Sequence, residues 1–173
     1  KASKQMAMEL VKGGQSAYRI VISAQAGPDI RYAADELAKY LASISGASLP
    51  VVEDGEAPQE KEIVIGSSNR QGAPCTAELK NDGYILKTVG NRLFILGENG
   101  RGCVYGVYGL LEAYLGCRFL AREVEVVPTG ADISLPELDE AKVSPLEYRE
   151  TYWYEPERFG DFAMKRGFNA SIT

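Results

Sequence analysis

The sequence predicts an α+β fold in which a mainly antiparallel or mixed sheet carries two helices on one face. Three observations support this class: apolar residues recur at the 3.6-residue helical period from Ile30 to Ile44, a second helical pattern covers residues 102–115, and short apolar runs typical of strands surround both. With 173 residues, 45% of them hydrophobic, the chain suits one soluble domain, or one domain and the start of another.

Turn and cap residues divide the chain into these elements. Asp29 is the expected N-cap of the first helix and Gly46 its stop. Pro50 limits the next strand to a sheet edge, because proline donates no ladder hydrogen bond. Val89-Gly90-Asn91 has the composition of a hairpin turn. Strands are expected at residues 18–23, 49–52, 62–66, 82–88, 92–96, 117–120, 123–127 and 132–135.

The segment from Pro136 to Pro145 is acidic and irregular, and it predicts a boundary in the chain. We expect a core domain at residues 1–137 and a linker at 138–145. Residues 146–173 then contain a strand-like run, Leu146–Trp153, and a helical pattern, Glu157–Arg166, without a closing element.

Composition disfavours several classes of function. The chain has 19 basic and 24 acidic residues and a net charge of −5, with no basic cluster of the kind that binds nucleic acid. No apolar run approaches the roughly 20 residues of a membrane span. The absence of histidine removes His-based triads and metal sites. Three scattered cysteines do not make a zinc site, and we expect free thiols and neither metal nor cofactor.

The stretch Gly97–Gly116, GENGRGCVYGVYGLLEAYLG, resembles a dinucleotide-binding fingerprint, but its glycines also form a stripe on the helix itself. A glycine inside a helix costs about 1 kcal/mol relative to alanine and therefore needs a reason. Three alternatives remain: helix–helix packing within the domain, docking of a second domain, and nucleotide binding. The expected interface residues are Gly102, Tyr105, Gly106, Gly109 and Ala113.

Several runs together resemble a known accessory domain. They are AADELAKYL at 33–41 followed by ISGASLPV at 44–51, EIVIG at 62–66, DGY at 82–84, RGCVYGVY at 101–108 and LGCR at 115–118. This combination resembles the N-terminal non-catalytic domain that precedes the (β/α)8 barrel in family 20 β-N-acetylhexosaminidases and family 67 α-glucuronidases. It is most similar to uncharacterised multidomain bacterial glycoside-hydrolase-like proteins, usually described as a domain of unknown function.

The resemblance extends to the C-terminal segment. PLEYRETYW at 145–153 resembles the first barrel strand of those proteins, so residues 146–173 would be the start of a truncated barrel. By this resemblance Arg149 would bind sugar hydroxyls, and Trp153 would offer a face to a sugar ring; barrel-wall packing is the alternative. Asp35-Glu36 resembles a catalytic carboxylate pair but lies within a helical pattern, where a solvated face is expected. No catalytic residue is expected before Thr173.

The sequence therefore predicts a non-catalytic accessory domain that docks on and stabilises a glycan-processing barrel. The expected partners are the C-terminal barrel of the same protein and, through it, glycans. A free-standing carbohydrate-binding module is the alternative from another class, and tyrosines are its candidate platform. The resemblance implies a parent glycoside hydrolase of carbohydrate metabolism that is secreted, periplasmic or on the cell surface.

Overall fold

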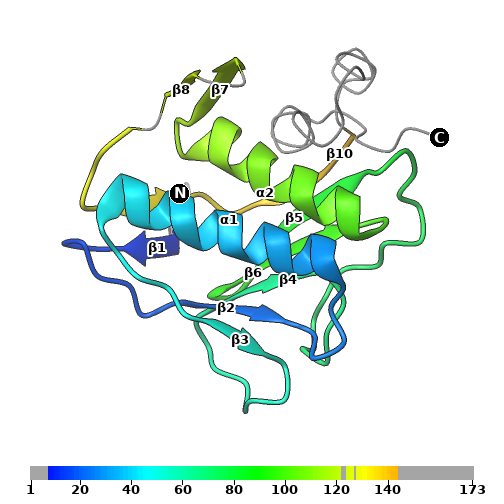
Figure 1. Ribbon diagram of the computed structural model, residues 1–173. Coiled ribbons are helices and arrows are strands. Elements are labelled where there is room, and N and C mark those ends of the chain that lie inside the picture. Colours follow the sequence, from blue (N-terminus) through cyan, green and yellow to red (C-terminus); the bar gives the residue numbers. More distant parts are fainter. Residues whose placement is uncertain (1–7, 122–123, 127, 144–173) are drawn as a thin grey trace, which may run out of the picture.

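A six-stranded mixed sheet forms the centre of the protein, with helices α1 and α2 side by side on one of its faces (Figure 1). The computed structural model describes residues 8–121, 124–126 and 128–143. The strand order is β10-β5-β6-β4-β2-β3, and two small sheets, β1-β9 and β7-β8, lie outside it. The elements are β1 Met8–Val11, β2 Arg19–Ile22, α1 Pro28–Ser45, β3 Val51–Glu53, β4 Glu62–Ile65, β5 Tyr84–Val89, β6 Arg92–Gly97, α2 Gly100–Tyr114, β7 Arg118–Ala121, β8 Val124–Val126, β9 Ile133–Leu135 and β10 Asp139–Lys142.

The sheet combines a parallel part with an antiparallel part, which confirms the predicted α+β class. β3, β2, β4 and β6 are mutually parallel, and Ile63 of β4 lies opposite Ile20 of β2 and Leu93 of β6. β5 joins β6 as the expected hairpin, and β10 pairs with β5 in antiparallel fashion. β3 lies at the edge, as Pro50 requires.

The two faces of the sheet are covered differently. Alternate residues such as Ile20, Ile63 and Leu93 join the core beneath the helices. Their neighbours Val21, Val64 and Phe94 form a smaller buried cluster on the opposite face, where Leu79 of the β4–β5 loop packs against them. Within the described residues, loops rather than helices therefore cover this second face.

Helix α1 begins two residues earlier than the sequence predicts. Gly27 is the N-cap and Pro28 starts the helix, so the expectation that Asp29 caps it is wrong: Asp29 lies in the first turn. At the other end Gly46 adopts the left-handed conformation and donates its N–H to the carbonyl of Ala42 at 2.7 Å, which confirms the predicted stop.

The segment predicted to be an irregular linker contains a strand. Asp139–Lys142 forms β10 at the edge of the central sheet, with Lys142 opposite Tyr84. The hydroxyl of Tyr114 donates to the Glu140 carboxylate, and this bond ties α2 to β10. β1 was also not predicted, and it pairs with β9. Residues 144–173 lie outside the described residues, so the predicted barrel start remains a prediction.

The glycines of α2 lie against the sheet of the same domain. A Cβ atom at Gly102 would come within 2.6 Å of the Gly83 carbonyl oxygen, and one at Gly106 within 2.9 Å of Cγ2 of Ile95. The ring of Tyr84 fills the space at Gly109. Burial, with Glu140 and Glu112 nearby, raises the pKa of Tyr84 to about 12, so this ring stays neutral. The stripe thus allows a close approach of helix and sheet.

Gly102→Ala should destabilise the protein by about 2 kcal/mol despite the better helix propensity of alanine, because a backbone carbonyl cannot give way to the new methyl group. Thermal and urea unfolding measure the effect. The control is Gly55→Ala in an exposed loop, where an added Cβ meets nothing within 4 Å and stability should change by less than about 0.5 kcal/mol. A Gly102→Ala protein as stable as the control would contradict this packing.

Candidate functional site

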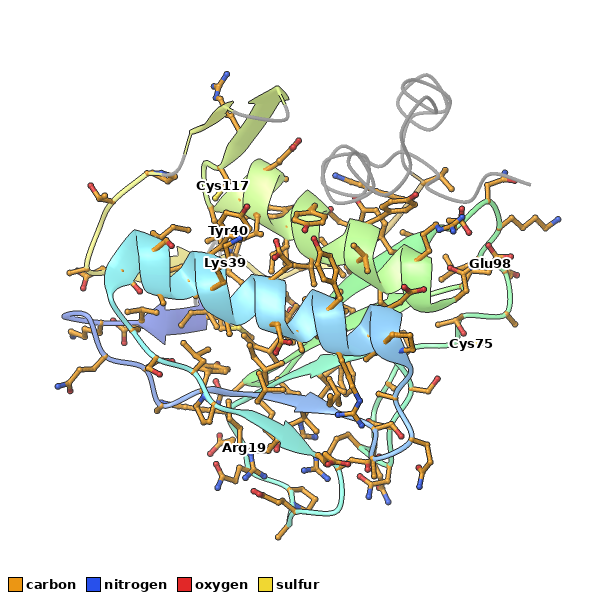
Figure 2. All side chains as sticks on the ribbon, in the orientation of Figure 1. Arg19, Lys39, Tyr40, Cys75, Glu98 and Cys117 are labelled. Atoms are coloured by element: carbon orange, nitrogen blue, oxygen red, sulfur yellow. The ribbon has the colours of Figure 1, made fainter. Side chains whose placement is uncertain are left out.

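A charged cluster crosses the start of three neighbouring parallel strands. Arg19, Glu62 and Arg92 are the first residues of β2, β4 and β6, and strand register places them in one row. Side-chain alternation puts this row on the face opposite the helices. Figure 2 accordingly shows Arg19 on the far side of the sheet from α1 and α2.

One fully buried carboxylate organises the cluster. Glu62 accepts from Nε of Arg19 at 3.0 Å and from Nη2 of Arg92 at 3.1 Å. Arg70, which comes from the β4–β5 loop, donates to it through Nε at 2.9 Å and Nη2 at 3.2 Å. Both carboxylate oxygens are thereby shared among three guanidinium groups, the kind of charge-assisted geometry that compensates for burial.

The same arginines fasten the β3–β4 loop onto the sheet. Arg70 donates to the carbonyl oxygens of Asp54 and Glu56, at 3.1 and 3.0 Å. Arg19 donates to the carbonyl of Ala57 at 2.5 Å, and Arg92 donates to that of Gln59 at 2.6 Å. A polar loop is therefore held by hydrogen bonds from guanidinium groups to its backbone rather than by apolar packing.

The electrostatics of Glu62 favour its charged form. Burial alone would raise the pKa of this carboxyl, but the hydrogen bonds and charges of Arg70 and Arg19 outweigh burial and hold the pKa below its ordinary value. The negative charge of Glu62 is consequently part of the folded structure, and protonating it weakens the cluster.

A hollow of about 500 Å³ opens beside the cluster. Its walls are residues 54–58, residues 69–71 and the side chain of Arg92. Nε of Arg92 is buried and has no acceptor in the described part of the chain. The lining of the hollow is thus polar and charged, and among these lining residues there is no nucleophile paired with a base.

The residues predicted as an interface with another domain lie mostly inside the domain. Gly102, Tyr105 and Gly106 are buried, and Gly109 is half-buried. Only Ala113 is exposed. The glycines are accounted for by contact with β5 and β6, and neither α1 nor a second domain is needed to explain them. Arg149 and Trp153 lie outside the described residues, so their roles remain predictions.

The α2 N-terminus, considered as a phosphate site, is filled by a side chain of the same protein. A Cβ atom at Gly100 would lie 2.8 Å from Cβ and 3.1 Å from Oδ2 of Asp29. This carboxylate therefore packs against the first turn of α2, where a negative charge is favourable. Asn99 supplies the cap by accepting from the N–H of Gly102 at 2.9 Å. β6 is parallel to β4, as a nucleotide site needs, yet the negative charge of Asp29 beside the first turn of α2 would repel a phosphate there.

Other reactive groups in the described part of the chain are isolated. Cys103 and Cys117 are buried and Cys75 is exposed, and all three are free thiols. Burial raises the pKa of Cys103 to about 12, which leaves it a poor nucleophile. Residues 8–121, 124–126 and 128–143 contain no group of three potential metal ligands. Within those residues no helix is long and apolar enough to span a membrane.

The sequence analysis missed the arginine–glutamate cluster, although a signal was present. In RIVI, EIVI and RLFI a charged residue stands directly before an apolar strand. A charge at the same place in three strands indicates a row of charges if the strands are neighbours and in register. Strand order was the missing information, since Glu62 is separated by 43 residues from Arg19 and by 30 from Arg92.

A protein family, one curated enzyme and two solved structures are similar to this chain, and each is a glycoside hydrolase or a part of one. Residues 7–110 match the family described as Glycosyl hydrolase family 67 N-terminus. An α-glucuronidase of Hypocrea jecorina is 34% identical over 104 residues, which cover 56% of this chain and 12% of that protein. The chain thus spans about an eighth of the length of this curated relative.

Two solved structures show the same fold at low sequence identity. A family GH115 4-O-methyl-α-glucuronidase with specificity for decorated arabinogalactans has a TM-score of 0.59 at 14% identity, covering 91% of this chain and 24% of its own. The N-acetyl-β-hexosaminidase of Streptomyces plicatus in complex with thio-NAglucal has a TM-score of 0.56 at 14% identity, covering 94% and 30%.

The fold and these matches define an accessory α+β domain of glycoside hydrolases. Within that class the chain belongs to the Glycosyl hydrolase family 67 N-terminus family, because the match covers more than half of its residues. The resemblance inferred from the sequence motifs is thereby confirmed.

Glu62→Gln should lower the free energy of unfolding by about 3 kcal/mol near neutral pH, because three guanidinium groups lose their shared charge. The pKa of Glu62 is lower in the folded than in the unfolded state, so its stabilisation is complete above about pH 4.5 and disappears as the pH falls through the folded-state pKa. Urea unfolding between pH 7 and pH 3 should show the gap between variant and wild type closing. Glu9→Gln, an exposed control, should match the wild type throughout, and a gap that is constant with pH would contradict this account.

The folding unit should extend beyond the matched residues 7–110, because β9 and β10 complete the sheets. A chain ending at Leu110 should lack a cooperative thermal transition, whereas one ending at Val143 should retain it. Circular dichroism in the near ultraviolet measures the transition, and a cooperative transition in the shorter chain would show that β9 and β10 are dispensable.

Proposed function

We propose that this chain is a non-catalytic domain that docks on, and stabilises, a glycan-processing barrel in a larger glycoside hydrolase. The observation that carries the proposal is the family membership, together with the small share of the relative's length that the chain covers. The substrate class follows from the relative, an α-glucuronidase, and the catalytic carboxylates would belong to the barrel. Secretion, a periplasmic location or the cell surface would suit such an enzyme.

The exposed end of α2 and the end of β10 are the surfaces on which we base docking on the helix side. Every residue from Gly102 to Tyr108 is buried, whereas α1 alternates buried and exposed residues as a surface helix does. β10 ends beside the loop that contacts the start of α2, since an added Cβ at Gly83 would lie 3.2 Å from the Lys142 carbonyl oxygen. Val143, the last described residue, therefore lies close to α2, and the exposed Ala113 near the end of this helix is the position we assign to the interface.

The carbohydrate-binding alternative requires aromatic rings exposed to solvent. In the described part of the chain, the tyrosines whose burial is described and Phe94 are buried or half-buried, and the large exposed hydrophobic residues are valines, namely Val51, Val89 and Val143. Stacking on sugars needs a ring face, which valine lacks. Docking is therefore favoured over a free-standing carbohydrate-binding module. Arg149 and Trp153 would contact glycan only as part of the barrel.

Docking is tested by placing a large charge at Ala113 in the full-length protein. Ala113→Arg should lower the thermal midpoint of the barrel and speed its inactivation, because an interface tolerates no unpaired charge. The same substitution should leave the isolated chain 1–173 unchanged, since Ala113 is exposed there.

Ala42→Arg is the matched control, an exposed alanine on α1, and it should leave both proteins unchanged. Equal thermal midpoints for full-length wild type and Ala113→Arg would exclude docking through this face. Measurable hydrolysis of an aryl glycoside by residues 1–173 alone would overturn the non-catalytic assignment.

A further inference from the structure

The start of α2 carries the single Asn–Gly pair of the chain, Asn99-Gly100. In such a pair the backbone nitrogen of the glycine attacks the side-chain carbonyl carbon of the asparagine, because no Cβ atom hinders its approach. The new C–N bond closes a succinimide ring, the old amide C–N bond breaks, and ammonia leaves with the proton of the attacking nitrogen. Water then opens the ring to aspartate or isoaspartate. Asn99 is exposed, so water reaches it.

Two hydrogen bonds restrain the Asn99 amide against this reaction. Its Oδ1 accepts from the N–H of Gly102 at 2.9 Å as the helix cap, and its Nδ2 donates to Oδ1 of Asp82 at 2.8 Å. The side-chain carbon must turn towards the nitrogen of Gly100 before the ring can close, and this rotation breaks both bonds. The folded protein therefore reacts only after the cap has opened locally.

The bond to Asp82 also anchors an unusual turn at residues 80–83. Asn81 and Asp82 both adopt left-handed backbone conformations, with φ of 55° and 56°, which are uncommon outside glycine. The N–H of Asp82 donates to the Glu98 carboxylate at 2.8 Å, and the N–H of Glu98 donates to the Gly83 carbonyl at 2.9 Å. The turn is thereby joined to the start of α2, where Figure 2 shows Glu98.

We propose that Asn99 is a deamidation site whose rate is set by opening of the cap, and whose conversion loosens this turn. The aspartate product is a carboxylate, which has no hydrogen to donate to Asp82 and repels it. Asp29 and Glu98 place two further carboxylates around the first turn of α2, so the new charge is unfavourable there. Isoaspartate in addition inserts a methylene group into the backbone at the cap.

The position of the turn gives the modification its consequence. An added Cβ at Gly83 would lie 3.2 Å from the carbonyl oxygen of Lys142 and 3.4 Å from Cγ1 of Val143, so the turn packs against the end of β10. An added Cβ at Gly102 would lie 2.6 Å from the Gly83 carbonyl oxygen, so the turn also packs against α2. Deamidation therefore loosens the place where α2, β5 and β10 meet. This inference does not depend on the proposed docking function, since it concerns contacts within the described chain.

Peptide mapping by mass spectrometry measures the rate, because the reaction replaces an amide NH₂ by OH and raises the mass of one peptide. During incubation of the chain 1–173 in mildly alkaline buffer, Asn99 should react at least about 10-fold more slowly than in the free peptide Leu96–Gly102, the equivalent of a local opening free energy of about 1.4 kcal/mol. An equal rate in protein and peptide would exclude control by the cap.

Two glycine variants separate the role of the Asp82 carboxylate from the flexibility of the turn. Asp82→Gly removes the acceptor of the Asn99 amide and suits the left-handed backbone, so deamidation should become about 5-fold faster, the equivalent of one hydrogen bond. Asn81→Gly is the matched control at the neighbouring left-handed residue, and its rate should stay within about 2-fold of the wild type. Equal rates in the two variants, or no reaction at Asn99 in Asp82→Gly, would overturn the proposal.

Asn99→Asp reproduces the aspartate product and tests its effect on the turn. Its thermal midpoint should lie about 2–4 °C below that of the wild type, because repulsion replaces one hydrogen bond. In the Asp82→Gly background the same substitution should lower the midpoint by less than about half as much, since the repelling carboxylate is gone. An unchanged midpoint in the single variant would contradict the loosening.

Discussion

The burial of one negative charge, that of Glu62, is the constraint on which the loop face of this protein depends. A carboxylate fully removed from water is tolerated only when it is paired and hydrogen-bonded, and Arg19, Arg70 and Arg92 provide both conditions. The guanidinium groups are then wholly or partly buried themselves, and they need further acceptors. Loop carbonyl groups between Asp54 and Gln59 supply these, so the cluster determines the path of the loop.

The two faces of the sheet are thus stabilised by different kinds of interaction. On one face, α1 and α2 bury a large apolar core, and the glycines of α2 let helix and strands approach. On the other face the described residues form only a small apolar cluster, and hydrogen bonds to buried charged groups hold the loops there. Apolar packing is continuous and closes all gaps, whereas a directional network leaves space between its bonds. This difference explains why the hollow lies on the loop face.

Local patterns in the sequence predict most elements of the fold but not the way they assemble. Helical periodicity, Pro50 and the turn at Gly90 each act within a few residues, and α1, the edge strand and the hairpin were predicted from them. β10 was missed because Asp-Glu-Ala-Lys has no apolar alternation: it is an edge strand held by backbone pairing with β5. The Glu62 cluster was missed for the same kind of reason, since its members meet only after the strands have been ordered.

The glycines of α2 illustrate what the sequence alone can and cannot predict about an interface. Their spacing establishes that something approaches the helix closely, and this is correct. It does not identify what approaches, and the structure assigns this role to Tyr84 and Ile95 of the sheet and to the carbonyl of Gly83, which directly precedes β5. A stripe already occupied inside the domain offers no contact to a neighbour. The surface that we propose for docking is therefore the exposed end of α2 near Ala113 together with the edge strand β10, and not the glycines.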